Sequence, residues 1–165
     1  MGKSFSKRTL RKISILLLDV DGVLTDGRIY YGDNGTEHKA FDAHDGYGIT
    51  RAMEHGLKIG FITGRQSSIV ERRARELGVT DVFQNSVNKV AAFEQVKSKY
   101  KIDDDEAAYM GDDLFDLPLL KKVGLSIAPK NAVEEVKDSV DFVTKAKGGR
   151  GAVREAIDMI LEAQG

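Results

Sequence analysis

Apolar residues along the chain gather in short runs that alternate with amphipathic segments. The runs have the length and polar flanks of buried strands, and they cover residues 15–20, 57–63, 79–84, 107–110, 125–128 and 140–143. Between them, apolar side chains recur as on one face of a helix, most clearly in the sets Val70/Ala74/Leu77, Phe93/Val96/Tyr100 and Val153/Ala156/Ile157/Ile160. Strands that alternate with helices predict an α/β fold with a parallel sheet and helices on both faces.

One segment departs from this alternation. Residues 27–31 and 36–41 flank Asp33-Asn34-Gly35, and an Asn-Gly pair suits a tight turn with positive φ. We therefore expect a β-hairpin over about residues 27–41, inserted directly after the first strand. Because a hairpin is marginally stable alone, we expect it to pack against something else, and a neighbouring subunit is one candidate.

Composition limits the possible functions. For 165 residues, one domain spanning 1–165 is the default, and 41% apolar residues can build a substantial core. The net charge is −1 and acids and bases are mixed along the chain, so the sequence shows no excess of positive charge of the kind that binds nucleic acid. Cysteine is absent, which excludes disulfides and thiolate chemistry. The apolar run at 13–20 is too short to span a bilayer, so we expect a cytoplasmic enzyme with no membrane partner.

The first predicted strand ends in two carboxylates, Asp19 and Asp21. In an open α/β sheet, the carboxyl ends of the strands form the ligand crevice. Strand alternation would aim the two side chains in opposite directions, but Gly22 lets the chain turn at once, so that Asp21 can swing back over the crevice. Taken alone, the pair is explained equally well as an acidic turn at a strand end.

Two further strand ends carry groups suited to an anion. Thr63, beside the flexible Gly64, can donate a hydrogen bond to a phosphoryl oxygen. Lys89 follows the third strand at the start of a helix and can neutralise phosphate charge. Simpler explanations exist for each residue alone: Thr63 would cap the next helix, and Lys89 would be a solvated helix lysine.

The fourth strand ends in three acids, Asp112, Asp113 and Asp116. Such a cluster is costly unless a cation lies among its members. Capping of a helix N-terminus by Asp112 or Asp113 explains one of these acids but not the set.

In chain order these groups are Asp-x-Asp, Thr, Lys and Gly-Asp-Asp-x-x-Asp, each at a strand end. The sequence thereby resembles the haloacid dehalogenase superfamily, whose four motifs have this order and placement. The resemblance implies a Rossmann-like fold and a phosphoryl-transfer enzyme. It implies that Asp19 is the nucleophile, that Asp21 acts as general acid and base, and that Thr63 and Lys89 hold the phosphoryl oxygens and steady the nucleophile.

The same resemblance implies a Mg²⁺ cofactor. Asp19, the backbone carbonyl of Asp21, and Asp112 would hold the ion. Asp113 and Asp116 would support the site, Asp113 through water or by orienting it. A bound cation lowers the repulsion between a carboxylate nucleophile and the phosphate that it attacks.

The spacing of the motifs narrows the resemblance to a branch without a cap domain, because neither 21–63 nor 89–112 leaves room for one. Residues 19–26, Phe41, and residues 45–49, 63–65, 111–116 and 148–155 are similar to the phosphatases of 3-deoxy-D-manno-octulosonate 8-phosphate, which belong to bacterial lipopolysaccharide synthesis. His44 departs from this pattern, since relatives often have arginine there. This likeness implies a small phosphorylated sugar acid as substrate. It also implies a homotetramer assembled through the hairpin.

Arg65 carries the substrate hypothesis. A planar guanidinium suits bidentate capture of a sugar-acid carboxylate, and a related branch for nine-carbon substrates looks acidic at this position. The predicted substrate-binding residues are Arg65, its neighbour Gly64, and Asp45 and Gly46. Glycine destabilises a helix, so the glycines at positions 46 and 48 favour a close approach of the backbone to a ligand. The simpler explanations are a surface arginine and an ordinary helix start.

Three alternatives remain open on the sequence. A phosphatase for a nine-carbon acidic sugar 9-phosphate keeps the chemistry and changes the substrate. A phospho-accepting receiver module also combines acids, Thr or Ser, Lys and Mg²⁺, but its acidic pair and its phosphorylated aspartate lie on different strands, whereas Asp19 and Asp21 share one. A partner subunit that has lost catalysis would not be expected to keep every motif residue.

Overall fold

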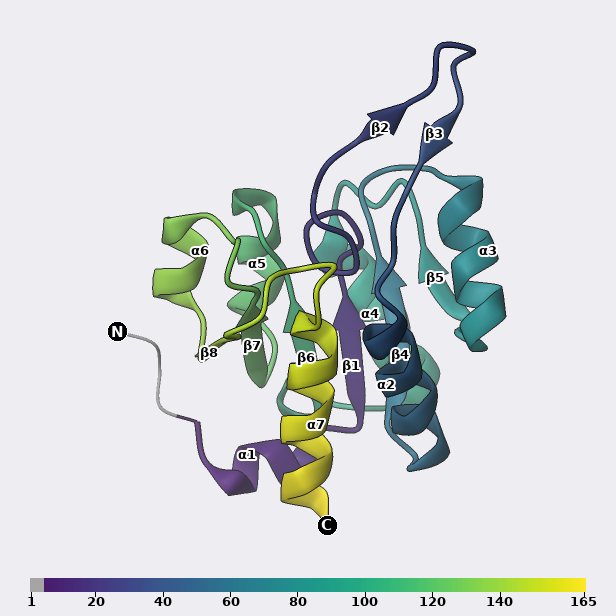
Figure 1. Ribbon diagram of the computed structural model, residues 1–165. Helices are drawn as coiled ribbons and strands as arrows, with labels where there is room; N and C mark the ends of the chain where they lie inside the picture. The colour runs from purple at the N-terminus through teal and green to yellow at the C-terminus, as the bar shows by residue number, and fades with distance from the viewer. Residues whose placement is uncertain (1–4) are drawn as a thin grey trace.

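A parallel sheet forms the centre of the computed structural model, which describes residues 5–165 (Figure 1). Its strand order is β5-β4-β1-β6-β7-β8, and every neighbouring pair is parallel. The strands are β1 Ile15–Leu18, β4 Lys58–Ile62, β5 Asp81–Phe83, β6 Ala107–Met110, β7 Leu125–Ala128 and β8 Phe142–Val143. The predicted parallel α/β fold is confirmed, and all six apolar runs contain a strand.

Helices cover both faces of the sheet, and each face has its own apolar core. Leu16 and Leu18 point into one core, and Ile15 and Leu17 into the other, as strand alternation requires. The first face packs against α1 Lys7–Lys12, α2 Ala43–Glu54, α3 Ser68–Leu77 and α7 Ala152–Gln164. The second packs against α4 Lys89–Tyr100, α5 Leu117–Leu120 and α6 Glu134–Ser139. Two 3₁₀ turns, η1 Asp104–Glu106 and η2 Leu114–Asp116, flank β6.

Helix α1 is not predicted by the apolar pattern, because Leu10 is its one buried residue. Its stability comes from α7. The side chain of Gln164 donates hydrogen bonds to the carbonyl oxygens of Leu10 (3.0 Å) and Ile13 (2.7 Å), and the Arg11 guanidinium donates to the carbonyl of Ala163 (3.1 Å).

The inserted hairpin is present and rises beyond the carboxyl edge of the sheet (Figure 1). Its strands are β2 Tyr30–Tyr31 and β3 Glu37–His38. The turn has positive φ at Gly35 of the Asn-Gly pair (80°), as expected, and the Gly35 N–H donates to the Gly32 carbonyl at 3.0 Å. The Asn34 side chain accepts a hydrogen bond from the Thr36 hydroxyl at 2.7 Å, which closes the loop locally.

Strand register brings the candidate residues to one edge. Leu18 pairs with Phe61 on one side and Met110 on the other, so the residues that follow these strands lie together at their carboxyl ends. The chain runs outward from β1 through β4 and β5, then returns to β6 on the other side, and ligands bind at such a reversal of strand order. Between β1 and β4 lie the hairpin and α2, and no cap domain is inserted in this described segment.

Candidate active site

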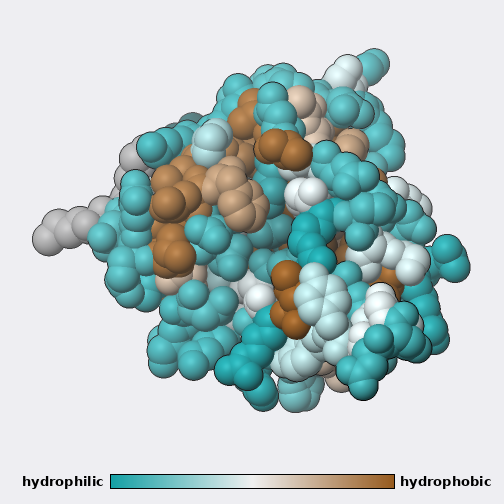
Figure 2. All heavy atoms as spheres, turned by 90° about the horizontal axis from the view of Figure 1, so that it is seen from above, coloured by the Kyte–Doolittle hydropathy of each residue, from teal (hydrophilic) through white to brown (hydrophobic). Residues whose placement is uncertain are grey.

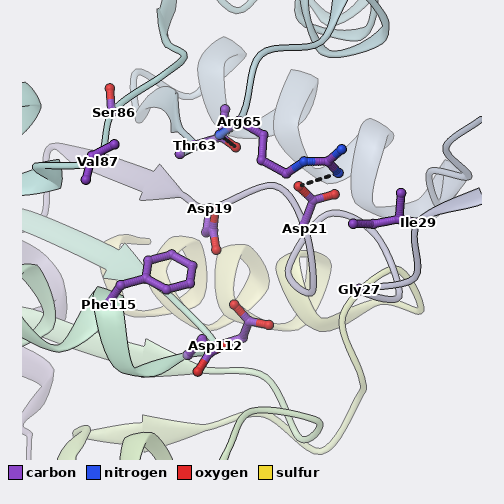
Figure 3. A pocket seen from close by; sticks show the side chains of 12 residues that line it. Asp19, Asp21, Gly27, Ile29, Thr63, Arg65, Ser86, Val87, Asp112 and Phe115 are labelled. Atoms are coloured by element: carbon purple, nitrogen blue, oxygen red, sulfur yellow. Dashed lines mark hydrogen bonds and ion pairs between the residues drawn. The ribbon is translucent and has the colours of Figure 1, made fainter. Parts of the chain in front are cut away.

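A cleft of about 530 Å³ opens at the carboxyl edge of the sheet (Figure 3). Its walls come from the ends of β1, β4, β5 and β6 and from the base of the hairpin. The lining residues are Asp19, Asp21, Gly27, Ile29, Thr63, Gly64, Arg65, Ser86, Val87, Asp112, Asp113 and Phe115. The structure thus brings together the groups that the sequence placed at three of the strand ends.

Asp19 lies at the base of the cleft and is 3% exposed. Its Oδ1 accepts the backbone N–H of Val20 at 2.8 Å and lies 3.0 Å from the ammonium of Lys89. Within the described chain Oδ2 receives no hydrogen bond, and it is therefore the oxygen available to a ligand. Burial raises the pKa of Asp19 to about 6, although the charge of Lys89 opposes this shift.

Lys89 lies beneath the cleft and not in its wall. Its ammonium contacts Asp19, Asp116 Oδ1 at 2.7 Å and the Tyr109 hydroxyl at 3.1 Å, and its side chain is 2% exposed. A buried ammonium between two carboxylates holds both in place. This position suits steadying of the nucleophile, and its contact with phosphoryl oxygens stays a prediction.

Asp116 is fully buried and satisfied by protein groups. Its Oδ1 accepts from Lys89 and from Tyr109 (2.5 Å), and its Oδ2 accepts the backbone N–H groups of Asp112 (2.9 Å) and Asp113 (3.2 Å). Four donors leave Asp116 little capacity for a metal ion, which favours the predicted supporting role. They also fix the loop that carries Asp112.

The acids form a set that fits a divalent cation. Asp19, Asp112 and Asp116 each present a carboxylate oxygen within 4.8 Å of the others. Burial raises the pKa of Asp112 to about 8, and the charges of Asp19 and Asp116 add to the shift. A hard cation among these oxygens would relieve the repulsion, and carboxylate oxygens are the donors that Mg²⁺ prefers. Asp19 and Asp112 are the two that face the cleft.

The loop after β1 carries Asp21 and depends on glycine. Gly22 has φ of 86°, and a side chain there would collide with the Asp112 carboxylate. The Thr25 hydroxyl accepts the N–H groups of Gly22 and Gly27, both at 3.2 Å. Asn131 donates to the Gly22 carbonyl at 3.0 Å and so ties this loop to the rest of the fold.

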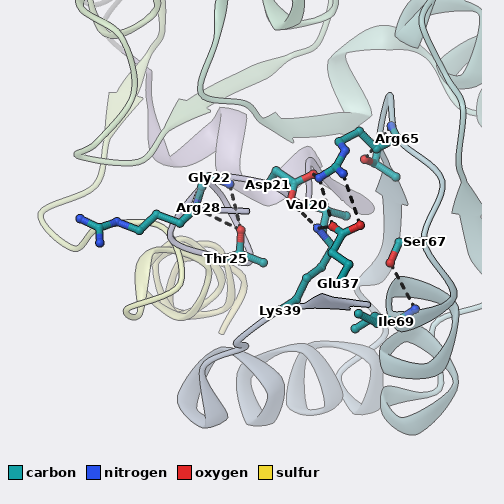
Figure 4. A network of polar contacts seen from close by, with 12 residues as sticks. Val20, Asp21, Gly22, Thr25, Arg28, Glu37, Lys39, Arg65, Ser67 and Ile69 are labelled. Carbon is teal, nitrogen blue, oxygen red and sulfur yellow. Dashed lines mark hydrogen bonds and ion pairs between the residues drawn. The ribbon is translucent and has the colours of Figure 1, made fainter. Parts of the chain in front are cut away.

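Thr63, Gly64 and Arg65 follow β4 and line the cleft as predicted. The Thr63 hydroxyl accepts the backbone N–H of Arg65 at 3.3 Å, so it remains free to donate its own proton to a ligand. The Arg65 guanidinium contacts both carboxylate oxygens of Glu37, at 3.1 and 3.3 Å, and lies 3.9 Å from Asp21 (Figure 4).

Asp45 and Gly46 do not line the cleft. Asp45 is buried in α2, where its Oδ1 accepts the backbone N–H of Arg154 at 2.9 Å, in the first turn of α7. A side chain at Gly46 would collide with the Arg73 guanidinium, and one at Gly48 would collide with Arg154. The close approach that these glycines permit is therefore to neighbouring side chains of this chain, which corrects the expectation of close approach to a ligand.

Sequence reasoning missed several residues at the site: Glu37, Lys39, Tyr109, Asn131 and the apolar wall of Ile29, Val87 and Phe115. Tyr109 has the pattern of an ordinary buried strand residue, and Asn131 lies in a loop without a motif. Lys39 and Glu37 were assigned only to the hairpin. Nothing local in the sequence shows that the hairpin base folds against Asp21.

Large apolar and aromatic side chains are exposed around the mouth of the cleft. Val87 is 88% exposed and Phe115 55%, and Ile29 on the hairpin is 43% exposed. Figure 2 looks down on this end of the molecule and shows brown apolar groups among teal polar ones. No helix in residues 5–165 is long and apolar enough to cross a membrane.

This parallel sheet, with Asp19, a buried lysine and facing carboxylates at its carboxyl edge, has the site of a phosphoryl-transfer enzyme of the haloacid dehalogenase type. The family model for haloacid dehalogenase-like hydrolases matches residues 75–157. The chain belongs to this family and, within it, to the group of the 3-deoxy-D-manno-octulosonate 8-phosphate phosphatases.

Three relatives carry the assignment to that group. The chain is 48% identical over 153 residues to the 3-deoxy-D-manno-octulosonate 8-phosphate phosphatase KdsC of Escherichia coli K12, covering 93% of this chain and 81% of that protein. The phosphatase of the same name from Yersinia pestis has a TM-score of 0.94 at 41% identity, over 96% of this chain and 85% of that one. The Moraxella catarrhalis enzyme, solved with magnesium, phosphate and 3-deoxy-D-manno-octulosonate, has a TM-score of 0.93 at 39% identity, over 96% and 91%.

Proposed function

We propose that this chain is a Mg²⁺-dependent phosphatase that releases phosphate from 3-deoxy-D-manno-octulosonate 8-phosphate, a step of lipopolysaccharide synthesis. One observation carries the proposal: Asp19 pairs with Lys89 and faces Asp112 at the base of a cleft. Arg65 lies in the wall of the same cleft. Relatives that match over nearly the whole chain are phosphatases of this substrate. The phospho-accepting receiver is disfavoured, because Asp21 supplies an acid and base beside the nucleophile.

The geometry supports a reaction in two steps. Asp19 Oδ2 attacks phosphorus, and the bond from phosphorus to the sugar oxygen breaks as Asp21 gives that oxygen a proton. Asp21 then takes a proton from the water that hydrolyses the aspartyl-phosphate. Thr63 donates to a phosphoryl oxygen, and Lys89 holds Asp19 in position. Mg²⁺ held by Asp19, the Asp21 carbonyl and Asp112 would lower the charge repulsion of the attack.

Arg65 favours an eight-carbon sugar acid as the substrate. Its side chain is 36% exposed at the wall of the cleft, and its guanidinium donates one hydrogen bond to a carboxylate oxygen of Glu37 and lies 3.1 Å from the other. A sugar-acid carboxylate presents the same two oxygens to it. A nine-carbon acidic sugar 9-phosphate is the second candidate, because the same arginine would also attract its carboxylate.

The hairpin supports a homotetramer as the working assembly. Ile29, Tyr30 and Tyr31 expose 43%, 42% and 71% of their surfaces, and a two-stranded hairpin is marginal without a partner. Contact of four hairpins would bury these side chains. We place the enzyme in the cytoplasm, where a phosphorylated sugar intermediate is available to it.

The test is phosphate release with Mg²⁺ from 3-deoxy-D-manno-octulosonate 8-phosphate, beside a nine-carbon acidic sugar 9-phosphate and common hexose phosphates. Asp19→Asn is the matched blank, since it keeps the shape of the side chain and removes the nucleophile. We expect a strong preference for the eight-carbon acid, with loss in the variant and after chelation of the metal. Better turnover of another substrate would refute the assigned substrate, and turnover unaffected by Asp19→Asn would refute the mechanism.

A further inference from the structure

The carboxylate of Asp21 is held by the hairpin and its neighbour Arg65. Among the residues that the structure describes, the charged groups in reach of it are Lys39, whose ammonium donates to Oδ1 at 2.7 Å, and Arg65 at 3.9 Å (Figure 4). Asp19, in contrast, is anchored by the next backbone N–H. The direction of the Asp21 side chain therefore depends on residues far from it in sequence.

Lys39 is the stronger of the two contacts. Its side chain is 2% exposed, which is rare for a lysine and stable only when carboxylates surround the ammonium. The second carboxylate is Glu37, at 3.0 Å from the ammonium. Lys39 directly follows β3, so the paired hairpin fixes the position of its backbone.

Arg65 has a different position in the same network. It is 36% exposed and paired with Glu37, so it can turn toward a ligand in the cleft while Lys39 stays in place. Two acids and two bases make up the network, and their charges cancel. The loss of Lys39 would leave Asp21 and Glu37 as two carboxylates that share one arginine.

We propose that Lys39 is a positioning residue for Asp21, holding its carboxylate where it exchanges a proton with the leaving sugar oxygen. The inference rests on the proposed function in that Asp21 is taken as the general acid. In that step the Asp21 O–H bond breaks as the new O–H bond forms on the sugar oxygen, which keeps the electron pair of the broken P–O bond. The hairpin thus contributes to catalysis as well as to assembly.

Leaving groups of different basicity separate positioning from simple structural support. A sugar alkoxide needs a proton as it leaves, whereas p-nitrophenolate leaves without one. General acid–base assistance is worth roughly 10²–10⁴ in rate. The quantity that separates the two is kcat/KM, because it covers only the steps up to departure of the leaving group. The later hydrolysis of the aspartyl-phosphate, in which Asp21 also acts, is common to both substrates. Misplacement of Asp21 therefore lowers kcat/KM for the sugar phosphate much more than for p-nitrophenyl phosphate, whereas general damage to the site lowers both equally.

The experiment compares kcat/KM for 3-deoxy-D-manno-octulosonate 8-phosphate and p-nitrophenyl phosphate at saturating Mg²⁺ in Lys39→Met, which keeps side-chain length without charge. We expect kcat/KM to fall about 10²-fold for the sugar phosphate and less than about fivefold for p-nitrophenyl phosphate. Lys39→Arg should recover most of the loss. The control is Lys99→Met, which removes a 2.6 Å ion pair with Asp81 at the start of β5, away from the cleft, and should change neither rate.

An equal fall for both substrates, or no fall for either, would overturn the positioning role. If Lys39→Met does not fold, as judged by circular dichroism and thermal melting, Lys39→Gln carries the same comparison. Failure of the proposed function is separately visible, because the wild type would then not hydrolyse the eight-carbon substrate. In that case a hexose phosphate that it does hydrolyse replaces the sugar phosphate in the comparison.

Discussion

The groups around each acid at the carboxyl edge of the sheet decide whether its oxygens are free to bind a cation, a proton or a ligand. Asp116 has four hydrogen-bond donors of the protein around it, so its oxygens are occupied. Asp19 and Asp112 face the cleft with raised pKa values, because burial and mutual repulsion favour a cation or a proton between them. Asp21 is anchored by the hairpin lysine. Identical side chains thus differ in their surroundings, and the roles proposed for them, in support, metal binding and proton transfer, follow these differences.

Arg65→Met should raise KM for 3-deoxy-D-manno-octulosonate 8-phosphate about 10- to 100-fold, since charged hydrogen bonds contribute about 1.5–3 kcal/mol. For p-nitrophenyl phosphate, which has no carboxylate, KM should change little. Steady-state kinetics on both substrates measure this difference. A similar rise in KM for both substrates would mean that Arg65 contacts the phosphate or supports the cleft, and would count against recognition of the sugar acid.

Helices α2 and α7 form a joint that the separate sequence patterns do not show. The N-cap of α7 is Gly151, which has no side chain, and Asp45 of α2 accepts the Arg154 N–H in its place. Gly46 and Gly48 leave space for Arg73 and Arg154 beside α2. A helix cap supplied by another helix couples the two elements. The close contact between the helices also explains Gly46 and Gly48, for which the sequence had suggested a ligand.

Asp45 should make stability depend on pH. Burial raises its pKa from 3.8 to about 6, with the nearby charge of Asp42 adding to the shift. The folded state therefore binds this proton more tightly than the unfolded state, so the stabilisation is full below about pH 4 and is lost as pH rises through about 6. This shift in the pKa of Asp45 corresponds to roughly 3 kcal/mol in the free energy of unfolding.

Asp45→Asn removes this titration while keeping an acceptor for the Arg154 N–H. Urea unfolding of both proteins between pH 4.5 and 7.5, at fixed saturating Mg²⁺, gives the free energies of unfolding to compare. The free energy of unfolding of the variant, minus that of the wild type, should increase as pH rises. Parallel curves for the two proteins would show that Asp45 does not titrate in this range.

At the scale of the whole molecule, the hairpin is the element that projects from the body (Figure 1). Ile29 at its base lines the cleft, Lys39 contacts the cleft residue Asp21, and Tyr31 is exposed. One insertion thus contacts the site at its base, and we propose that its outer end forms the interface of the assembly. Assembly and catalysis are expected to depend on each other for this reason.

Tyr31→Asp should reduce the mass in solution from four chains toward one or two, because a charge buried among packed hairpins is costly. Light scattering after size-exclusion chromatography measures the mass. Val133→Asp, at a residue 40% exposed outside the hairpin, is the control and should leave the mass unchanged. An unchanged mass for Tyr31→Asp, or a wild type that is already a monomer, would refute assembly through the hairpin.

The sequence predicted the parallel sheet, the hairpin and the cluster of Asp19, Thr63 and Asp112, because apolar runs mark buried strands and parallel strands end at one edge. Local pattern could not predict α1, whose stability comes from contacts with α7. It also misassigned the space at Gly46, since sequence shows that a side chain is absent but not what fills the space.

The sequence by itself determined the strands and their order along the chain, because these depend on periodicity within short segments. Its four motifs also determined the family, through their resemblance to the haloacid dehalogenase pattern. Only the tertiary structure decided that Lys89 lies beneath Asp19, that Asp45 caps another helix and that Lys39 holds Asp21. Each of these contacts joins residues that are remote along the chain. Such contacts exist only once packing has placed the elements against one another.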